Sequence, residues 1–426
     1  MRLISLKNTV LLFLVLVLSC ASKGEENSEP EVHGERDKAV PSAGANQTEE
    51  YLALLQNKSI ALVANQTSGI YNGKLKRTFV KVLASGDTLY DLKRDQTHLV
   101  DSLLSRGVNI KNVFAPEHGF RGRVDAGELV ADGKDLKTGL PIVSLYGKNK
   151  KPSNAQLQGI DLVVFDIQDV GVRFYTYIAT MHLVMEACAE QNIPMLILDR
   201  PNPNGHYIDG PTMLPKHTGF LGKHPIPLVH GMTIGEYAQM INGEGWLKNG
   251  IQCDITIIKN KYYDHKSFYS LPVRPSPNLP NDIAINLYPS LGLLEGTTIN
   301  AGRGTEMQFQ IFGDPNLPQD IYKFTYTPES NFGAKYPKHK GSECNGLDLR
   351  KTTFMSQVDL TWIIEAYQNH PDKASFFNTD NFTAHAGTPE LQKQIEAGWS
   401  MDQIRDSWML EIEGFKKTRA KYLLYE

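Results

Sequence analysis

The fold is decided by the stretch Gly159-Ile-Asp-Leu-Val-Val-Phe-Asp-Ile-Gln-Asp-Val-Gly-Val-Arg-Phe-Tyr-Thr-Tyr177. Its segment from Leu162 to Phe165 is apolar at every position, which is typical of a parallel strand covered on both faces. Asp166, Asp169 and Arg173 follow this segment, and aromatic residues come next. Because ligand sites in open parallel sheets lie beyond the carboxyl ends of the strands, this polar tail is either an ordinary loop or one wall of a binding site.

Strand and helix patterns alternate around this stretch. Apolar strand patterns occupy 59–64, 109–115, 141–146, 162–165, 194–198 and 255–258, and helical patterns lie between several of them, as at 97–106 and 178–191. Such alternation predicts an α/β fold with a doubly wound parallel sheet and right-handed crossovers. We assign residues 51–258 to this domain.

The pattern changes after residue 258. A Pro-rich irregular segment precedes a short apolar run at 284–287, which we interpret as a strand, and three helical patterns follow. Two of these helices are predicted to begin with capping pairs, Ser356 with Asp359 and Ser400 with Gln403. Residues 259–426 are therefore predicted to form a second, smaller α+β domain, with its Gly-rich segment at 293–306 facing the first domain.

The N-terminus has the features of a targeting segment. Two basic residues precede an unbroken apolar run from Val10 to Leu18, which has the length of a signal-peptide core and is too short to span a bilayer. Val17-Leu18-Ser19-Cys20 resembles a bacterial lipobox, so we expect a lipoprotein signal peptide over 1–20 and lipidation of Cys20. Secretion with cleavage nearby is the alternative. Residues 21–50 are rich in Glu, Ser, Gly and Asn, which predicts a disordered tether.

Composition and missing motifs exclude several functions. The chain has 426 residues, a formal net charge of −3 and 21% charged residues, which argues against a nucleic-acid-binding protein. No GxGxxG follows the first strand and no GxxxxGK[ST] occurs, so a nucleotide cofactor is not expected. The histidines and cysteines lack metal-site spacing, so no metal is indicated, and no GxSxG indicates an esterase. Cys188, Cys253 and Cys344 are expected to be buried free thiols.

Polar residues follow the carboxyl ends of several predicted strands. They are Asn65, Glu117 with His118, Asp166, and Asp199 with Arg200. Because parallel strands end at the same edge of a sheet, we expect these side chains to converge on one rim.

Glu117 is the strongest candidate for an acid–base residue. It follows a strand and has Phe120 nearby, and an acid beside apolar rings can hold a proton near neutrality. Asp166 and Asp169 are candidate partners, because hydrolysis of a glycosidic bond commonly uses two carboxyl groups. The alternatives are an exposed loop glutamate at 117 and a structural cap at Asp166.

Other side chains could hold a ligand. Tyr175 and Tyr177 could stack on a sugar or pack in the core. Arginines are suited to clamp a carboxylate, although each could equally be a salt-bridge residue; the candidates are Arg121, Arg123, Arg173 and Arg303. The segments Asp199-Arg200-Pro-Asn202 and Glu295 to Arg303, which contains Asn300, could contact ligand hydroxyls or form simple turns.

Five motifs resemble those of the exo-β-N-acetylmuramidase (NamZ-type) family over nearly the whole chain after Lys58. The motifs are Ala-Pro-Glu-His-Gly-Phe-Arg-Gly (115–122), Phe-Asp-Ile-Gln-Asp-Val-Gly-Val-Arg-Phe-Tyr-Thr-Tyr (165–177), Leu-Asp-Arg-Pro-Asn-Pro (198–203), Gly-Thr-Thr-Ile-Asn-Ala-Gly-Arg-Gly-Thr (296–305) and Tyr-Leu-Leu-Tyr (422–425). The resemblance implies a Rossmann-like catalytic domain, a smaller C-terminal domain and a site in the cleft between them.

The same resemblance implies hydrolysis of terminal N-acetylmuramic acid from the non-reducing ends of peptidoglycan fragments. It implies that Glu117 is catalytic and gives the arginines a lactyl carboxylate to bind. Asp166 is the preferred second carboxylate, with Asp169 and Glu295 left open. The predicted substrate-binding residues are His118, Arg121, Arg173, Tyr175, Tyr177, Asp199, Arg200, Asn202, Glu295, Asn300 and Arg303.

The leading hypothesis is thus a lipid-anchored glycosidase of the bacterial cell envelope that acts on muropeptides without a cofactor. A non-catalytic lipoprotein that captures muropeptides would use the same cleft and is the alternative. An esterase or deacetylase is a third hypothesis, disfavoured by the missing nucleophile and metal motifs.

Overall fold

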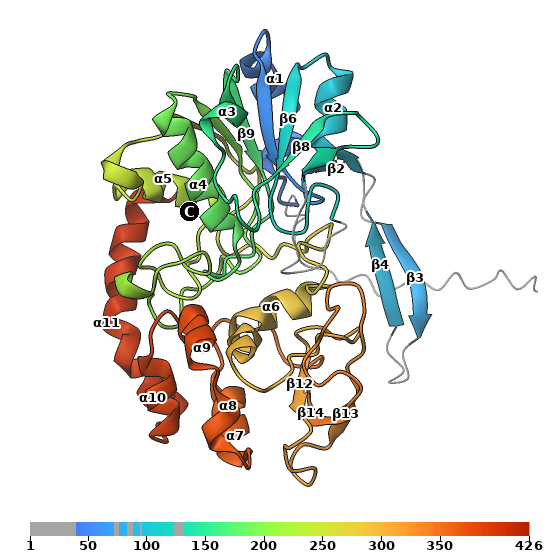
Figure 1. The fold of residues 1–426 in the computed structure, drawn as a ribbon, viewed down its shortest axis with the longest axis vertical. Coiled ribbons are helices and arrows are strands. Elements are labelled where there is room, and N and C mark those ends of the chain that lie inside the picture. The colour runs from blue at the N-terminus through green and yellow to red at the C-terminus, as the bar shows by residue number, and fades with distance from the viewer. Residues whose placement is uncertain (1–39, 72–75, 83–87, 94–95, 123–131, 426) are drawn as a thin grey trace, which may run out of the picture. The chain divides into compact units, whose positions relative to one another are not determined.

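A seven-stranded sheet forms the centre of the N-terminal part of the structure (Figure 1). The computed structural model describes residues 40–71, 76–82, 88–93, 96–122 and 132–425, with only the backbone described between 76 and 93. The strand order is β11-β10-β9-β1-β6-β8-β7, and every neighbouring pair is parallel except β7 with β8. The strands are β1 (Ile60–Ala64), β6 (Ile110–Ala115), β7 (Gly133–Lys134), β8 (Pro141–Ser144), β9 (Leu162–Asp166), β10 (Met195–Leu198) and β11 (Ile255–Ile258).

Helices cover both faces of this sheet. Side chains alternate along each strand, so Ala61 and Val63 join one apolar core while Leu62 and Ala64 join another. The first core includes α4 (Tyr177–Glu190) and α5 (Ile234–Gly243); the second includes α1 (Thr48–Leu55) and α2 (Leu99–Ser105). The short α3 (Asn154–Leu157) precedes β9. The predicted doubly wound, Rossmann-like α/β sheet is confirmed.

The C-terminal part combines a small sheet with helices, as predicted for an α+β region. Strands β12 (Ile311–Asp314), β14 (Cys344–Asp348) and β13 (Phe324–Tyr326) form an antiparallel sheet in that order. The helices are α6 (Asp282–Leu291), α7 (Thr361–Asn369), α8 (Lys373–Phe376), α9 (Thr379–Ala386), α10 (Glu390–Glu396) and α11 (Met401–Arg419). Figure 1 shows α6 above β12, β13 and β14, with α7, α8 and α9 beside them.

Two local predictions in this part are wrong. The run 284–287 lies inside α6, where the Asn281 side chain accepts from the Ala284 amide at 2.9 Å and caps the helix. A four-residue apolar run cannot by itself distinguish a buried helix from a strand. Helix α7 begins at Thr361 rather than after Ser356, because Asp359 accepts from the Thr361 amide.

The last long helix has the predicted form. Ser400 and Gln403 make a reciprocal capping box at the start of α11. Its residues Ile404, Trp408, Ile412 and Phe415 are all buried. This stripe is core packing, and it holds α11 against the rest of the fold.

The predicted tether extends too far along the chain. Ser42 pairs with Lys261, the Gly44 amide donates to the Asp199 carbonyl at 2.7 Å, and α1 begins at Thr48. A segment with so few apolar residues is ordered here because its backbone hydrogen bonds to the sheet domain. The expected signal peptide and Cys20 lie outside the described residues.

Two small hairpin-like pairs complete the described fold: β2 (Gly69–Tyr71) with β5 (Gln96–His98), and β3 (Lys76–Val82) with β4 (Thr88–Lys93). The mostly polar stretch from Tyr71 to Asp95 offers no pattern from which a role could be assigned. Nowhere in the described ranges does a helix combine the length and hydropathy that crossing a bilayer requires.

Candidate active site

Glu117 lies directly after β6, in a sharp turn. His118 and Gly119 both have positive φ, 70° and 74°, and they reverse the chain within two residues. The Glu117 side chain is half-buried, and Thr176 Oγ1 donates to its Oε2 at 2.8 Å. His118 is only 3% exposed. The turn thus presents Glu117 to the surface of the site while its neighbour is enclosed.

A second donor reaches Glu117 from the end of β8. The Tyr146 phenol is hydrogen bonded to the Glu117 side chain, and burial first, then the charge of Glu117, raises the pKa of Tyr146. Tyr146 therefore stays protonated at neutral pH and donates to the carboxylate. The Thr176 hydroxyl and the Tyr146 phenol together fix the orientation of the Glu117 carboxylate.

The strand ends converge on one rim, as expected. Asn65 Nδ2 donates to Tyr177 Oη at 2.9 Å, and Tyr177 Oη lies 3.4 Å from the Glu117 carbonyl oxygen. Ser68 donates its hydroxyl to the Asp166 carbonyl, which joins the ends of β1 and β9. Residues from β1, β6, β8 and β9 thereby form one continuous polar network behind Glu117.

Tyr175 and Tyr177 belong to the packed wall of this rim and are not open sugar platforms. Their rings meet edge to face, with centroids 4.8 Å apart and an interplanar angle of 77°. They are 6% and 1% exposed. Tyr175 donates to the Pro275 carbonyl at 2.7 Å. The predicted stacking role is therefore replaced by a structural one.

Asp166, the preferred second carboxylate, is held by Arg200. Arg200 Nε lies 2.6 Å from Asp166 Oδ1, and Nη2 lies 2.9 Å from Oδ2. Both side chains are fully enclosed. A carboxylate with both oxygens paired and no exposure cannot meet a sugar, so the expected catalytic role of Asp166 and the expected ligand role of Arg200 are not supported by this geometry.

Asp169 is buried but less completely paired. Its Oδ2 accepts from the Gly171 amide at 2.7 Å, while Oδ1 has no hydrogen-bond partner among the described residues. Burial raises the pKa of Asp169 to about 7, against the lowering effect of the Gly171 and Val170 amides. His230 Nε2 lies 3.8 Å from Oδ2. Asp169 is enclosed behind the rim, since it is only 5% exposed.

Asp199 and Asn202 organise the chain rather than an open surface. Asp199 Oδ1 accepts from the Gly235 amide at 2.8 Å, and Oδ2 accepts from Thr233 Oγ1 at 2.7 Å and Tyr425 Oη at 2.5 Å. Asn202 donates to the Met232 carbonyl at 2.9 Å. Both are buried, so the predicted contacts with ligand hydroxyls are replaced by contacts within the fold.

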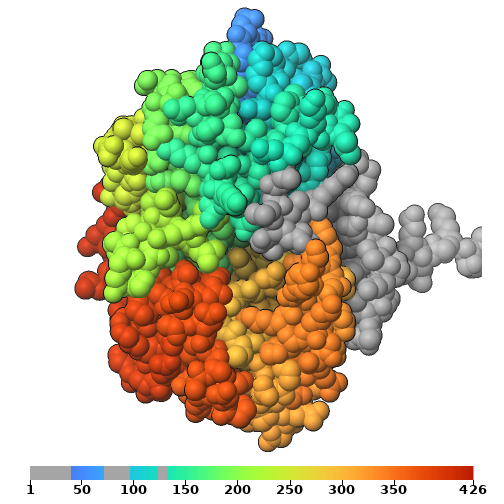
Figure 2. Space-filling model, viewed as in Figure 1, coloured from blue at the N-terminus to red at the C-terminus, as the bar shows by residue number. Residues whose placement is uncertain are grey.

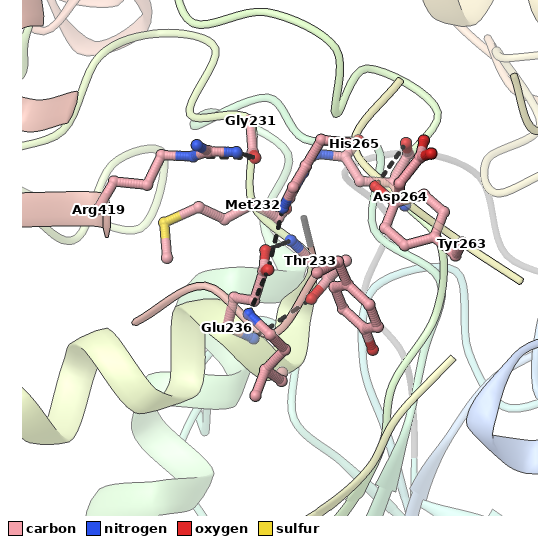
Figure 3. Close-up of polar contacts among 12 residues, drawn as sticks. Gly231, Met232, Thr233, Glu236, Tyr263, Asp264, His265 and Arg419 are labelled. Carbon is pink, nitrogen blue, oxygen red and sulfur yellow. Dashed lines mark hydrogen bonds and ion pairs between the residues drawn. The ribbon is translucent and has the colours of Figure 1, made fainter. Parts of the chain in front are cut away.

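The C-terminal tail returns to the same edge of the sheet. Glu236 accepts from the Thr233 amide at 2.9 Å, from His265 Nε2 at 3.0 Å and from the Leu424 amide at 2.8 Å, while Arg419 donates to the Gly231 carbonyl (Figure 3). The tail motif 422–425 therefore stabilises the junction of α5 and α11.

Two candidate arginine clamps are already engaged. Arg121 pairs with Asp135 at 2.7 Å and Asp101 at 3.3 Å. Arg173 is 1% exposed, and among the described residues its hydrogen bonds all go to backbone carbonyls. These are the carbonyls of Pro211 (2.7 Å), Ile226 (2.8 Å), His385 (2.9 Å) and Ala386 (2.7 Å). Neither arginine is placed to clamp a substrate carboxylate. Arg123 lies outside the described residues.

Glu295 and Arg303 form a partly exposed ion pair in the C-terminal part. Arg303 Nη1 lies 3.0 Å from Glu295 Oε2, and the side chains are 27% and 23% exposed. Arg303 Nη2 donates to the Gly333 carbonyl at 3.3 Å, and Nε has no partner among the described residues. Asn300 sits beneath this pair, donating to the Arg303 carbonyl at 3.1 Å, and it is buried. Its predicted ligand contact is thus replaced by support of the loop.

Tyr288 on α6 packs against the tyrosine wall of the rim, with its ring centroid 6.1 Å from that of Tyr175. Burial raises the pKa of Tyr288, and the charges of Glu295 and Glu117 act in the same direction. Burial raises the pKa of Glu295, but Arg303, Lys338 and His385 outweigh it and bring the value below the ordinary range. Glu295 is therefore ionised near neutral pH. Figure 2 shows that this face is hollowed where green, gold and orange parts of the chain meet.

Sequence reasoning missed Tyr146, Thr176, Tyr288, Lys338 and His385. Thr176 lies in the stretch that decides the fold, between Tyr175 and Tyr177, which were predicted to bind substrate. Its place between these two candidates is the one sequence feature that could have suggested a role in the site. The others carry no local motif. Within the described part of the chain, no group of three or more His, Cys, Asp or Glu side chains is arranged to hold a metal ion.

The arrangement suits acid–base chemistry on a neutral bond. Glu117 is a partly exposed carboxyl held by two hydroxyl donors, and Glu295 is an ionised carboxylate paired with a partly exposed guanidinium. Two such groups can supply the proton and the negative charge that glycosidic cleavage requires.

Comparisons with known proteins give one consistent family. Residues 60–283 match the family described as exo-beta-N-acetylmuramidase NamZ, N-terminal, and residues 286–425 match its C-terminal counterpart. The peptidoglycan beta-N-acetylmuramidase NamZ of Bacillus subtilis (strain 168) is 36% identical over 422 residues, covering 95% of this chain and 94% of the relative.

Two solved structures from Bacteroides fragilis NCTC 9343 have the same fold, and both are DUF1343 family proteins. One is 42% identical with a TM-score of 0.79, covering 91% of this chain and 99% of that chain. The second is 26% identical with a TM-score of 0.71, covering 92% and 100%.

Proposed function

Because this chain belongs to the exo-beta-N-acetylmuramidase NamZ family, we propose that it is a glycoside hydrolase that releases N-acetylmuramic acid from the non-reducing ends of peptidoglycan fragments. The near full-length match to a peptidoglycan beta-N-acetylmuramidase is the observation that carries this conclusion. The exposed carboxyl of Glu117, oriented by Thr176 and Tyr146, supports it, because glycosidases need a positioned acid.

Glu117 acts as the general acid. Its proton goes to the glycosidic oxygen as the bond to the anomeric carbon breaks, and the aglycone leaves as an alcohol. Thr176 and Tyr146 donate to the carboxylate that remains, which stabilises it until a proton is regained.

Glu295 is the second carboxylate. It either stabilises the positive charge that develops at the anomeric carbon or bonds to that carbon for a time. In both cases a water molecule then bonds to the anomeric carbon and displaces any bond to Glu295, its proton returns to Glu117, and N-acetylmuramic acid is released. Two observations support Glu295 over Asp166 and Asp169: it is partly exposed, and its pKa is lowered. Arg303 beside it binds the lactyl carboxylate that distinguishes N-acetylmuramic acid from N-acetylglucosamine.

Substrates with two different leaving groups distinguish the proposed roles of Glu117 and Glu295. An aryl glycoside with an acidic phenol as leaving group needs no proton, so Glu117→Gln should retain activity on it while losing at least about 100-fold on a muramyl-glucosamine disaccharide. Glu295→Gln should lose activity on both substrates. Glu343→Gln, at an exposed position, is the matched control and should equal the wild type.

The outcomes are distinct. Full activity of Glu117→Gln on the disaccharide would remove Glu117 from its role. Disaccharide binding by the wild type with no N-acetylmuramic acid released would support the non-catalytic muropeptide-binding alternative.

We propose in addition that the chain is a lipoprotein of the bacterial cell envelope, anchored through Cys20. The apolar run from Val10 to Leu18 and the lipobox-like sequence support this. Cys20→Ala should move the expressed protein from the membrane fraction to the soluble fraction. Unchanged membrane association would contradict the anchor.

A further inference from the structure

Lys338, between β13 and β14, inserts its ammonium among four backbone carbonyls. Nζ lies 2.8 Å from the carbonyl oxygen of Leu294, 3.2 Å from that of Glu295, 2.6 Å from that of Thr297 and 3.1 Å from that of Ile299. An ammonium has three N–H donors, so the four oxygens share them. All four oxygens belong to the turn that carries Glu295, which begins as a 3-10 helix over Gly292–Gly296.

The backbone around Lys338 is tied to the same turn. Asn300 Nδ2 donates to the Lys338 carbonyl at 3.0 Å, and His339 Nε2 donates to the Thr298 carbonyl at 2.8 Å. The lysine is thus fixed from both its main chain and its ammonium. These contacts keep the Lys338 ammonium at the turn and out of solvent. Burial lowers the pKa of Lys338.

The charge of Lys338 also acts on Glu295. The groups that face Glu295 are Arg303, Lys338, His385 and the Tyr288 phenol. Among the described residues, only Arg303 forms an ion pair with its carboxylate, at 3.0 Å. Lys338 instead bonds the backbone beneath it and adds positive charge.

A neutral donor could satisfy these carbonyls without helping the carboxylate. An amide supplies two N–H groups and no charge, whereas the ammonium supplies three and a full charge. Placing a cation here is costly in desolvation. Charge-assisted hydrogen bonds offset part of this cost, and the effect of the same charge on Glu295 gives the ammonium a second role.

We propose that Lys338 is a positioning residue of the active site, which fixes the turn at 294–299 and keeps the Glu295 carboxylate in place and ionised. The inference rests on the proposed function, because it assigns Lys338 a role through Glu295. Lys338 itself does not touch the substrate.

The test uses removal and chemical replacement of the ammonium. Lys338→Ala deletes three carbons and Nζ, the outline of n-propylammonium. We expect kcat on the muramyl-glucosamine disaccharide to fall about 100-fold, since a misplacement of about 1 Å costs that much, while KM changes less than about threefold. Loss of a nearby positive charge raises the pKa of Glu295, so the acid limb of the kcat–pH profile should move to higher pH.

Added n-propylammonium should raise the kcat of Lys338→Ala at least about tenfold and return the acid limb of its kcat–pH profile to the wild-type position. The uncharged 1-propanol should not, because it fills the space without the charge. Lys340→Ala, at an exposed lysine of the same loop, is the matched control and should behave as the wild type. Lys338→Met keeps a four-atom apolar stem without the ammonium and should show the same shift of the acid limb if Lys338→Ala does not fold.

The failures can be told apart. Lys338→Ala and Lys338→Met with a normal kcat and an unmoved acid limb would overturn the inference, even if their thermal midpoints fall. Equal rescue by 1-propanol would also overturn it. Full activity of Glu295→Gln would instead overturn the assignment of Glu295 in the proposed function.

Discussion

Arg200 binds both carboxylate oxygens of Asp166, with 2.6 Å between Nε and Oδ1 and 2.9 Å between Nη2 and Oδ2. The pair is fully buried and joins the end of β9 to the loop after β10. Arg200 Nη2 also donates to the Gly69 carbonyl at 3.2 Å. The pair therefore ties three segments of the rim behind Glu117, and its contribution is to the fold.

Asp166→Asn should destabilise the protein and leave the chemistry of the folded molecules nearly intact. Removing one partner of a buried ion pair leaves an uncompensated charge and costs about 3–5 kcal/mol. Urea unfolding should show this loss, while kcat corrected for the folded fraction should stay within about threefold of the wild type. A stable Asp166→Asn protein with kcat reduced more than about 100-fold would return Asp166 to the catalytic pair.

Asp169 should make the stability depend on pH. Burial raises its pKa to about 7 in the folded state, against about 3.9 when unfolded. Between these values the folded state holds the proton that the unfolded state has released, so the contribution of Asp169 to stability falls by about 1.4 kcal/mol per pH unit as pH rises, and this loss ends above about pH 7. His230 acts in the opposite direction, because burial lowers its pKa to about 3 and its own contribution to stability therefore rises with pH up to about 6.5. The difference between an Asp169 variant and the wild type separates the two effects.

Asp169→Asn removes this titration. The variant should gain stability relative to the wild type as pH rises from 5 to 7, measured by urea unfolding at each pH. Parallel curves for the two proteins across that range would show that Asp169 is ionised in the folded state.

Arg173 and Gly387 meet where the sheet domain contacts the end of α9. Gly387 has a φ of +84°, and a Cβ added there would lie 2.7 Å from Arg173 Nη2 and 2.8 Å from the Met213 backbone. Four carbonyl bonds hold the guanidinium in place, so it cannot move aside cheaply.

Gly387→Ala should therefore cost more than backbone strain alone. Gly398 also has a positive φ, +75°, but a Cβ there meets nothing within 4 Å. Gly398→Ala should lower the free energy of unfolding by about 1 kcal/mol, and Gly387→Ala should lower it by at least about 2 kcal/mol more. Urea unfolding of the two variants measures both losses. Equal losses would show that the Arg173 contact yields without cost.

The central strands were predictable because buried parallel strands contain continuous apolar runs, such as 162–165 in β9. The position of Glu117 followed from the same logic, since it comes directly after β6. Helix α6 was mistaken for a strand because its apolar run at 284–287 is too short to show a helical period.

The roles of charged residues were less predictable, because they depend on partners far away in the chain. The sequence suggests that Arg173 is a carboxylate clamp. Two of the four backbone carbonyls that its guanidinium binds are, however, 212 and 213 residues away in the chain. Lys338 has no motif of its own, and its acceptors are about 40 residues earlier. Backbone carbonyls are present at every residue, so no residue pattern marks those that a buried cation will bind.

Arg303 should decide which sugar is accepted. N-acetylmuramic acid differs from N-acetylglucosamine by a lactyl ether with a carboxylate, and Arg303 is partly exposed, with its buried Nε not hydrogen bonded to any described residue. The wild type should therefore prefer the muramyl aryl glycoside over the glucosaminyl one. Arg303→Gln keeps an amide beside Glu295 but removes the charge, and a lost charge-assisted bond costs about 1.5–3 kcal/mol.

The ratio of kcat/KM values for the two glycosides isolates this effect. Arg303→Gln lowers the rate on both substrates, because it also removes the partner of Glu295, and that shared loss cancels in the ratio. The preference should fall by about 10- to 100-fold. Arg350→Gln, which removes a similarly exposed arginine paired with Asp348 at the end of β14, should keep the wild-type ratio. An unchanged ratio in Arg303→Gln would mean that another group binds the lactyl carboxylate and that Arg303 acts on Glu295 alone.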